Sequence, residues 1–245
     1  MNHLFNLKHY KEILNSALQS DYTFCKFSDL STDRRKIYLR HDVDNCVDSA
    51  YIMAKVEQEL RVHSTYLFFL RSKNYNILSE DTLEKIKQIH LMGHDIGLHA
   101  ILENNKRLGT TIKNDLSLMK RILDINVKVF SIHNPTEQEF QVDVPGMINV
   151  YGKAYFEDIK YISESNMQWR EGCPCEILKN KKYQELQILI HPMTYRYDFK
   201  NDRDILKYFL YSKIIELKEL NERENKNLIE EKISINELTD YFLNG

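Results

Sequence analysis

The stretch Lys36-Ile37-Tyr38-Leu39-Arg40-His41-Asp42-Val43-Asp44 decides the fold class. Its first five residues are typical of a β-strand, and the polar residues His41 to Asp44 come where that strand ends. Apolar strand-like runs and helix-like periods then alternate along the chain. The alternation predicts an α/β protein with a mostly parallel sheet, open or closed into a barrel, and with helices outside it.

The alternation continues on both sides of this stretch. We predict helices near residues 7–18, 47–60, 79–92, 110–123 and 202–231, with a last short helix ending near 243, and further strands at 64–70, 95–99, 127–132, 159–162 and 186–190. Ser79 with its acidic successors is a plausible helix start, and Gly93 a helix stop. No linker or repeat divides the chain. We therefore predict a single domain over 1–245, with a helix and lead-in over 1–35 and helices over 200–245 packed on the barrel.

Composition excludes several classes of protein. The chain has 245 residues, 34 basic and 36 acidic side chains and a net charge of −2, so it has no general attraction to nucleic acid or to anionic membranes. It has neither a membrane-length apolar run nor a cationic start followed by an apolar segment. We expect a cytoplasmic protein with no nucleic-acid partner and no membrane span. A homodimer contact through the charged helix near the C-terminus is an alternative to its packing on the barrel.

The four cysteines are too few for a disulfide framework in a chain of this length. Cys173-Pro174-Cys175 could hold a metal, but two further Cys or His residues at the usual zinc spacing are missing. We expect a reduced surface loop there, with a structural zinc as the alternative.

Polar side chains at the carboxyl ends of the predicted strands indicate where chemistry could occur. Asp42 and Asp44 point the same way in extended backbone, so they could share a divalent metal or divide into ligand and base. A strand-end turn with Asp44 capping the next helix is the alternative. His99 could be a metal ligand, and Glu103 would face the same centre if a helical turn follows. This donor set suits zinc, iron, manganese or cobalt better than calcium or magnesium.

Two more histidines, His133 and His191, follow predicted strands. A neutral histidine there could donate to an oxyanion or protonate a leaving group. Trp169 and Arg170 could stack on a sugar and pair with an anionic group, or could simply be a buried Trp and a surface Arg. We interpret His90 and His94 as structural. The signatures of dinucleotide-binding, P-loop, zincin and serine-hydrolase sites are all absent.

These residues resemble the polysaccharide deacetylase superfamily, carbohydrate esterase family four, and most closely a divergent subgroup associated with bacterial surface-polysaccharide gene clusters. The resemblance runs from about Ile37 to Tyr195. It depends on segments 39–44, 93–99, 131–135, 161–165 with 169–170, and 188–192. It implies a distorted (β/α) barrel that removes N- or O-acetyl groups from glycans with one divalent metal, zinc first, with iron, manganese or cobalt as alternatives.

The resemblance also implies roles for individual residues. Asp42 would be the general base, Asp44 and His99 metal ligands, and His191 the acid that protonates the leaving group. Glu103 stands where the family usually has a second histidine ligand, so the third ligand would be a carboxylate, or metal binding would be weakened or lost. The residues expected to contact substrate are Arg40, His133, Trp169, Arg170 and Tyr195.

Three hypotheses for function follow. The first is a metal-dependent deacetylase acting on an acetylated sugar or glycan precursor in surface-polysaccharide biosynthesis. The second is a non-catalytic glycan-binding or assembly protein on the same barrel, motivated by the missing second histidine. The third is a metal-dependent phosphoesterase, which has little support because few basic residues beyond Arg40 and Arg170 could hold a phosphate.

Overall fold

The computed structural model describes residues 5–29, 31–101, 107–165, 167–199, 201–225 and 233–244. The chain divides into two compact units, residues 1–200 and 201–245. The second unit contains α8 (Asp202–Glu224) and α9 (Ile235–Asn244), as the sequence predicts. The packing of these helices on the barrel stays a prediction. Within the described ranges, no helix combines the length and the apolar character needed to cross a membrane.

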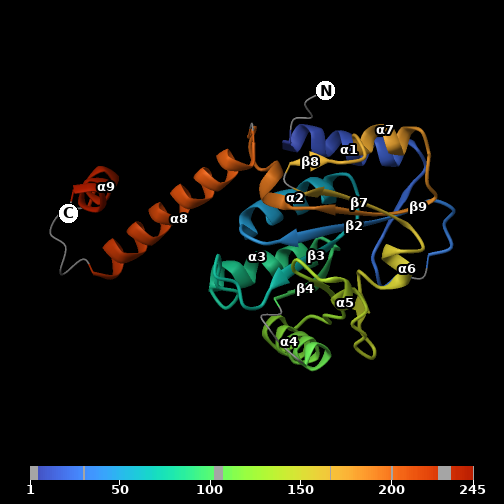
Figure 1. Ribbon diagram of the computed structural model, residues 1–245, viewed down its shortest axis with the longest axis horizontal. Helices are drawn as coiled ribbons and strands as arrows, with labels where there is room; N and C mark the ends of the chain where they lie inside the picture. Colours follow the sequence, from blue (N-terminus) through green and yellow to red (C-terminus); the bar gives the residue numbers. More distant parts are fainter. Residues whose placement is uncertain are drawn as a thin grey trace. The chain divides into compact units, whose positions relative to one another are not determined.

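The first unit is built on a curled, nine-stranded sheet with the strand order β6-β5-β4-β3-β2-β9-β7-β8, in which β1 also pairs with β2 (Figure 1). All of its strand pairs are parallel except β7 with β8. The α/β class and the barrel-like parallel sheet are therefore confirmed, and among the described strands the sheet stays open between β6 and β8. The strands are β1 (Thr23–Cys25), β2 (Lys36–Val43), β3 (Thr65–Phe69), β4 (Asp95–Ala100), β5 (Val129–Ile132), β6 (Ile148–Asn149), β7 (Lys160–Ser165), β8 (Gln168–Trp169) and β9 (Glu185–Ile190).

The long helices of this unit agree with the sequence prediction, whereas the short elements were not predicted. Ser79 is the N-cap of α3, which has acidic residues in its first turn, and Gly93 follows the helix with φ +99°. The helical elements are α1 (Leu7–Gln19), α2 (Val47–Glu59), α3 (Glu80–Leu91), α4 (Leu108–Leu123), α5 (Glu137–Phe140), α6 (Lys153–Phe156), α7 (Pro174–Lys179) and the 3₁₀ turn η1 (Pro192–Tyr195).

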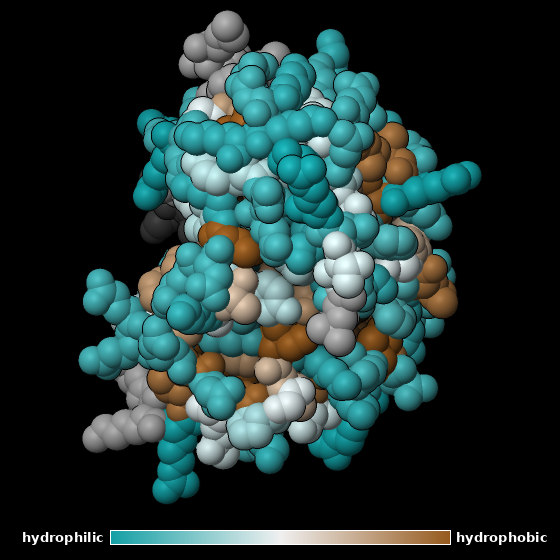
Figure 2. All heavy atoms as spheres, turned by 90° about the vertical axis from the view of Figure 1, so that its right-hand side faces the viewer, coloured by the Kyte–Doolittle hydropathy of each residue, from teal (hydrophilic) through white to brown (hydrophobic). Residues whose placement is uncertain are grey.

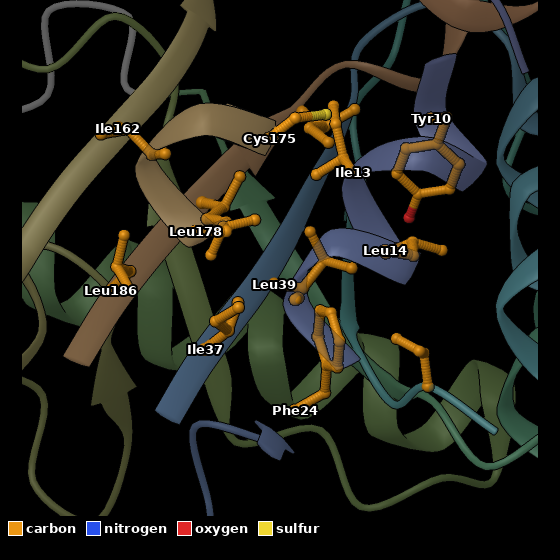
Figure 3. Close-up of a cluster of buried hydrophobic side chains, with 14 of the residues drawn as sticks. Tyr10, Ile13, Leu14, Phe24, Ile37, Leu39, Ile162, Cys175, Leu178 and Leu186 are labelled. Atoms are coloured by element: carbon orange, nitrogen blue, oxygen red, sulfur yellow. The ribbon is translucent and has the colours of Figure 1, made fainter. Parts of the chain in front are cut away.

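The two faces of the sheet bury different sets of side chains, because successive residues of a strand point to opposite faces. The inner face of the curl carries a core that includes Tyr38, Leu67 and Val129. The outer face packs against helices in two further clusters. In one of them, α1 and α7 cover β2, β9 and β7 (Figure 3). Polar side chains cover most of the molecular face in Figure 2, with hydrophobic ones visible between them.

The surface-loop prediction for Cys173 and Cys175 is wrong. Cys173 is 8% exposed and caps α7, and Cys175 lies inside that helix with 6% of its surface exposed. The physical reason is that α7 is amphipathic. Leu178 of α7 belongs to the same buried cluster as several residues of α1. Both thiols therefore lie in the interior between α7 and α1.

Candidate metal centre

Four ionisable side chains meet at the carboxyl ends of four strands of the curled sheet. Asp44 follows β2, His99 lies in β4, His133 follows β5 and His191 follows β9. His99 Nε2 lies 3.2 Å from Asp44 Oδ1 and 3.3 Å from His133 Nδ1. His133 Nδ1 lies 3.9 Å from Asp44 Oδ1, and His191 Nε2 lies 3.8 Å from Asp44 Oδ2. Asp44 is therefore the common neighbour of three imidazole rings.

Asp44, His99 and His133 form a group that could hold a metal ion, since one ligand atom from each lies within 4.8 Å of the others. Asp44 Oδ1 is buried and receives no hydrogen bond from the described residues. A buried carboxylate oxygen without a donor is costly, and a cation removes that cost. One carboxylate and two imidazoles form a donor set that suits zinc, iron, manganese or cobalt. The residues present thus fit the metal that the sequence resemblance implies.

Neighbouring groups fix the orientation of His99 and the protonation of His133. His99 is 2% exposed, its Nδ1 lies 2.6 Å from Ser131 Oγ, and its ring stacks on Phe69. This contact turns the other nitrogen, Nε2, towards Asp44, as in metal sites where a second partner sets the ring. For His133, burial lowers the pKa, and the raising effect of Asp44 does not compensate for it. A neutral imidazole is the form that binds metal.

Asp42 is held by a buried arginine from its own strand. Arg40 is fully buried, and it donates from Nε to Asp42 Oδ1 at 2.8 Å and from Nη2 to Oδ2 at 2.6 Å. Tyr151 and Gln187 each accept one further hydrogen bond from the guanidinium. Burial raises the pKa of Asp42, but Arg40 and His99 outweigh it and hold that pKa well below its usual range. Asp42 is therefore a fixed, ionised carboxylate beside the metal-capable group.

His191 is held by a buried glutamate. Glu164 Oε1 accepts from the His191 backbone N–H at 2.7 Å and lies 3.1 Å from the ring atom Nδ1. Burial favours the neutral ring, but Glu164, Asp44 and Asp42 outweigh it and raise the pKa of His191 to about 9. In the metal-free site these carboxylates favour the charged form of the ring at neutral pH, and its Nε2 is turned towards Asp44.

A second buried network lies on the outer face of β2, behind the site. The Glu57 carboxylate of α2 lies 2.7 Å from His41 Nε2 and 3.3 Å from His94 Nδ1, and it accepts from Ser64 at 2.5 Å and from Tyr66 at 3.0 Å. Tyr10 of α1 also donates to Glu57. Burial raises the pKa of Glu57, but the charge of His41 and the hydrogen bonds outweigh it and lower that pKa to about 2. The structural role expected for His94 is consistent with this position.

The other predicted site residues lie in different surroundings. Glu103 lies outside the described residues, so its role as a ligand stays a prediction. Trp169 and Arg170 line a cavity of about 230 Å³, and Trp169 is otherwise buried. Tyr195 is fully buried, with its ring against Phe5 and Tyr10. The structure therefore brings Trp169 and Arg170 to a cavity, but it does not bring Tyr195 to an open surface.

Sequence reasoning assigned no role to several residues that support the site. Ser131 and Glu164 orient His99 and His191, and Tyr151 and Gln187 complete the hydrogen bonding of Arg40. Ser131 and Glu164 stand in the segments that carry the family resemblance, and their polarity at strand ends was a usable signal. Tyr151 and Gln187 had none, because their contacts with Arg40 join distant parts of the chain.

No family model and no curated protein matches the sequence. Several solved structures resemble the fold. The polysaccharide deacetylase Bc1974 from Bacillus cereus is 15% identical over 71% of this chain and 83% of its own, with a TM-score of 0.45. The Streptococcus pyogenes deacetylase PplD, solved with acetate, is 11% identical over 78% and 84%, with a TM-score of 0.44.

A pseudoenzyme of carbohydrate esterase family four, BA3943 from Bacillus anthracis, is 10% identical with a TM-score of 0.43. The match covers 74% of this chain and 60% of that protein, so this chain spans less than two thirds of its length. The described residues themselves show an α/β protein with a curled, mostly parallel sheet and an Asp-His-His group. Its activity has to be argued from the side chains.

Proposed function

We propose that this protein is a metal-dependent hydrolase that removes an acetyl group from a sugar or glycan precursor. The observation that carries the proposal is the arrangement around Asp44. A metal-capable Asp-His-His group lies between a fixed carboxylate, Asp42, and a charged imidazole, His191. A hydrolase that uses acid and base chemistry needs these three components within reach of one substrate.

Asp44, His99 and His133 would hold the metal. When bound, a divalent ion of this kind polarises an acyl oxygen and lowers the pKa of a water molecule. His99 is fixed by Ser131, so its Nε2 keeps one direction. Such preorganisation avoids the cost of reorienting a ligand during the reaction. Glu103, a carboxylate ligand in one of the two outcomes that the family resemblance implies, would add a fourth ligand to this set.

Asp42 would orient the attacking water and receive its proton. Each Asp42 oxygen accepts one hydrogen bond from Arg40, which leaves lone pairs free to accept from a water. The low pKa of Asp42 makes it a weak base in the resting site. The carboxylate therefore takes the proton as the water forms its bond to the acyl carbon, when that proton becomes acidic.

His191 would protonate the leaving nitrogen or oxygen of the sugar. Its side chain is 29% exposed, so a substrate can reach the ring. Glu164 accepts from the ring nitrogen Nδ1, which leaves the proton on Nε2 free to point into the site. The cavity beside Trp169 and Arg170 offers an aromatic ring and a guanidinium, the groups that would contact a sugar and an anionic carrier group.

The proposal is tested by metal analysis together with acetate release. Wild-type protein should bind one more divalent ion per chain than Asp44→Ala and His99→Ala do, whereas Asp48→Ala, with a half-exposed side chain on α2, should bind as much as wild type. Acetylated sugars and nucleotide-sugars are then screened for acetate release. On the best of them, Asp42→Asn should lower kcat by at least about 100-fold, the usual contribution of a general base.

Two outcomes would count against the proposal. If neither zinc, iron, manganese nor cobalt binds through Asp44 and His99, the hydrolase mechanism fails. Tight binding of a glycan by the metal-free protein would then favour a non-catalytic glycan-binding role. If Asp42→Asn keeps full turnover on a confirmed substrate, the assignment of the base is wrong.

A further inference from the structure

Three soft or borderline metal ligands meet in a second place in the molecule, between α1 and α7. His9 belongs to α1, whereas Cys173 and Cys175 flank Pro174 at the start of α7. His9 Nε2 lies 3.3 Å from Cys173 Sγ and 3.9 Å from Cys175 Sγ. All three ligand atoms lie within 4.8 Å of one another. This cluster shares no residue with the group around Asp44.

We propose that His9, Cys173 and Cys175 form a second metal site, which binds a thiophilic ion of the zinc class. Zinc lies about 2.3 Å from a thiolate and about 2.0–2.1 Å from an imidazole nitrogen. With tetrahedral angles these lengths place the nitrogen and each sulfur about 3.6 Å apart. The two distances between His9 and the thiols, 3.3 Å and 3.9 Å, lie on either side of that value.

The surroundings of the cluster are buried and apolar. They favour metal binding by these three side chains over a role as solvent-exposed thiols. The exposed fractions are 8% for His9, 8% for Cys173 and 6% for Cys175, and the neighbours are apolar side chains of α1 and α7. Figure 3 shows Cys175 among Ile13 and Leu178, over β2 and β9. A nitrogen and two sulfurs that converge inside an apolar cluster form a donor set that selects zinc or Cu(I) over magnesium or calcium.

The ligand spacing explains why the sequence offers a zinc at Cys173 and Cys175 only as an alternative and does not reveal His9 as their partner. Common zinc motifs place two ligands within a few residues of each other and a second pair nearby. Here the pair Cys173 and Cys175 is local, and its partner comes from the other end of the first unit, 164 residues away from Cys173. The described residues supply three ligands, and a tetrahedral ion takes a fourth. Binding releases the thiol protons, so affinity should fall at acid pH.

A metal in this place would join two parts of the molecule. It would fix α1 at His9. The residue after His9, Tyr10, donates a hydrogen bond to Glu57 of α2. It would also fix the segment that enters α7, directly after Trp169, Arg170, Glu171 and Gly172, which line the cavity. The site would therefore brace one wall of that cavity from behind. The inference is independent of the proposed hydrolase activity.

The test is cobalt substitution of the full-length, reduced, metal-free protein, read by absorption. Co²⁺ bound to thiolates gives an intense sulfur-to-metal charge-transfer band in the near ultraviolet, and an Asp-His-His site contains no sulfur. We expect this band in wild type, and in Asp44→Ala, which lacks the other proposed site, it should saturate with one equivalent of cobalt. It should be lost in Cys173→Ser and Cys175→Ser, retained in Asp44→Ala, and retained in Cys25→Ser, which removes a different buried thiol. The band therefore reports this site whether or not the group around Asp44 binds metal.

Three results would overturn the inference. The first is the absence of the band in reduced wild-type protein, a result that does not depend on any variant folding. The second is a band that persists when Cys173 and Cys175 are both replaced. The third is a disulfide between these two cysteines. It would be detected as a fall from four to two titratable thiols in unfolded protein purified without reductant, with no cobalt or zinc bound after reduction.

Discussion

Replacing Glu57 with glutamine should destabilise the protein strongly, although Glu57 touches no group of the proposed metal centre. The carboxylate is fully buried and faces His41 and His94. It also accepts hydrogen bonds from Tyr10, Ser64 and Tyr66. Glutamine has the same size, but its amide group presents a donor where the protein already supplies donors.

The magnitude follows from the pKa of this carboxyl. The surroundings lower it from an ordinary value of 4.5 to about 2. At roughly 1.4 kcal/mol per pKa unit, this corresponds to about 3 kcal/mol of stability at neutral pH. A buried polar group left without its hydrogen-bond partner costs about 1–3 kcal/mol, and more where a charged group is involved. We therefore expect Glu57→Gln to lower the free energy of unfolding by about 3 kcal/mol at pH 7.

The assay is urea unfolding followed by circular dichroism, with Glu59→Gln as the control. Glu59 lies on the same helix, and its exposed carboxylate pairs with Lys11 at 3.3 Å. That replacement should change stability by less than about 0.5 kcal/mol. Because the folded-state pKa of Glu57 is depressed, its contribution is present above pH 4.5 and is lost as the pH falls towards 2. The difference between wild type and Glu57→Gln should shrink over that interval. An equal effect of both variants, or a difference independent of pH, would refute the reasoning.

Two further predictions concern Gly97 of β4 and Glu164 of β7. A methyl group added at Gly97 would lie 2.6 Å from the Val129 carbonyl oxygen, so Gly97→Ala should cost about 1–3 kcal/mol in urea unfolding. Gly109→Ala, in a helix where the nearest atom would lie at 3.5 Å, should be neutral or slightly stabilising, and similar losses in both would contradict the steric argument. Glu164→Gln should lower the pKa of His191 from about 9, because burial then opposes the charged ring with less compensation. An NMR titration of the metal-free protein measures this pKa, and an unchanged value would remove Glu164 from its role.

The sequence predicts the parts of the fold that depend on local patterns of apolar and polar residues. Apolar runs gave β3 and β9, and the acidic turn after Ser79 gave the start of α3. Polar residues at strand ends gave Asp44 and His191, because parallel strands bring their carboxyl ends to one edge. These features need no knowledge of distant contacts.

The parts that sequence does not predict depend on contacts between distant residues. The two-residue strands β6 and β8 carry no period of their own and exist because a neighbour pairs with them. His133 was expected to face the substrate, and its approach to Asp44 depends on how two separate loops pack. The partners of Glu57 come from α1, β2 and β3 and from the loops beside β3 and β4. An acidic residue in an amphipathic helix is usually exposed, so the sequence alone did not indicate that Glu57 is buried.

Strand β2 places charged groups on both of its faces, and this has a consequence for folding. Arg40 and Asp42 point to the inner face, and His41 points outward to Glu57. A slip of one residue in the pairing of β2 with β3 or β9 would exchange these sets. It would leave Arg40 and Asp42 among the apolar residues of the helices and Glu57 without its histidine. Each unpaired buried charge costs several kcal/mol. An apolar strand in the same place would tolerate a shifted alignment, whereas in β2 the shift is strongly unfavourable. The residues that build the candidate site therefore also determine the register of the sheet.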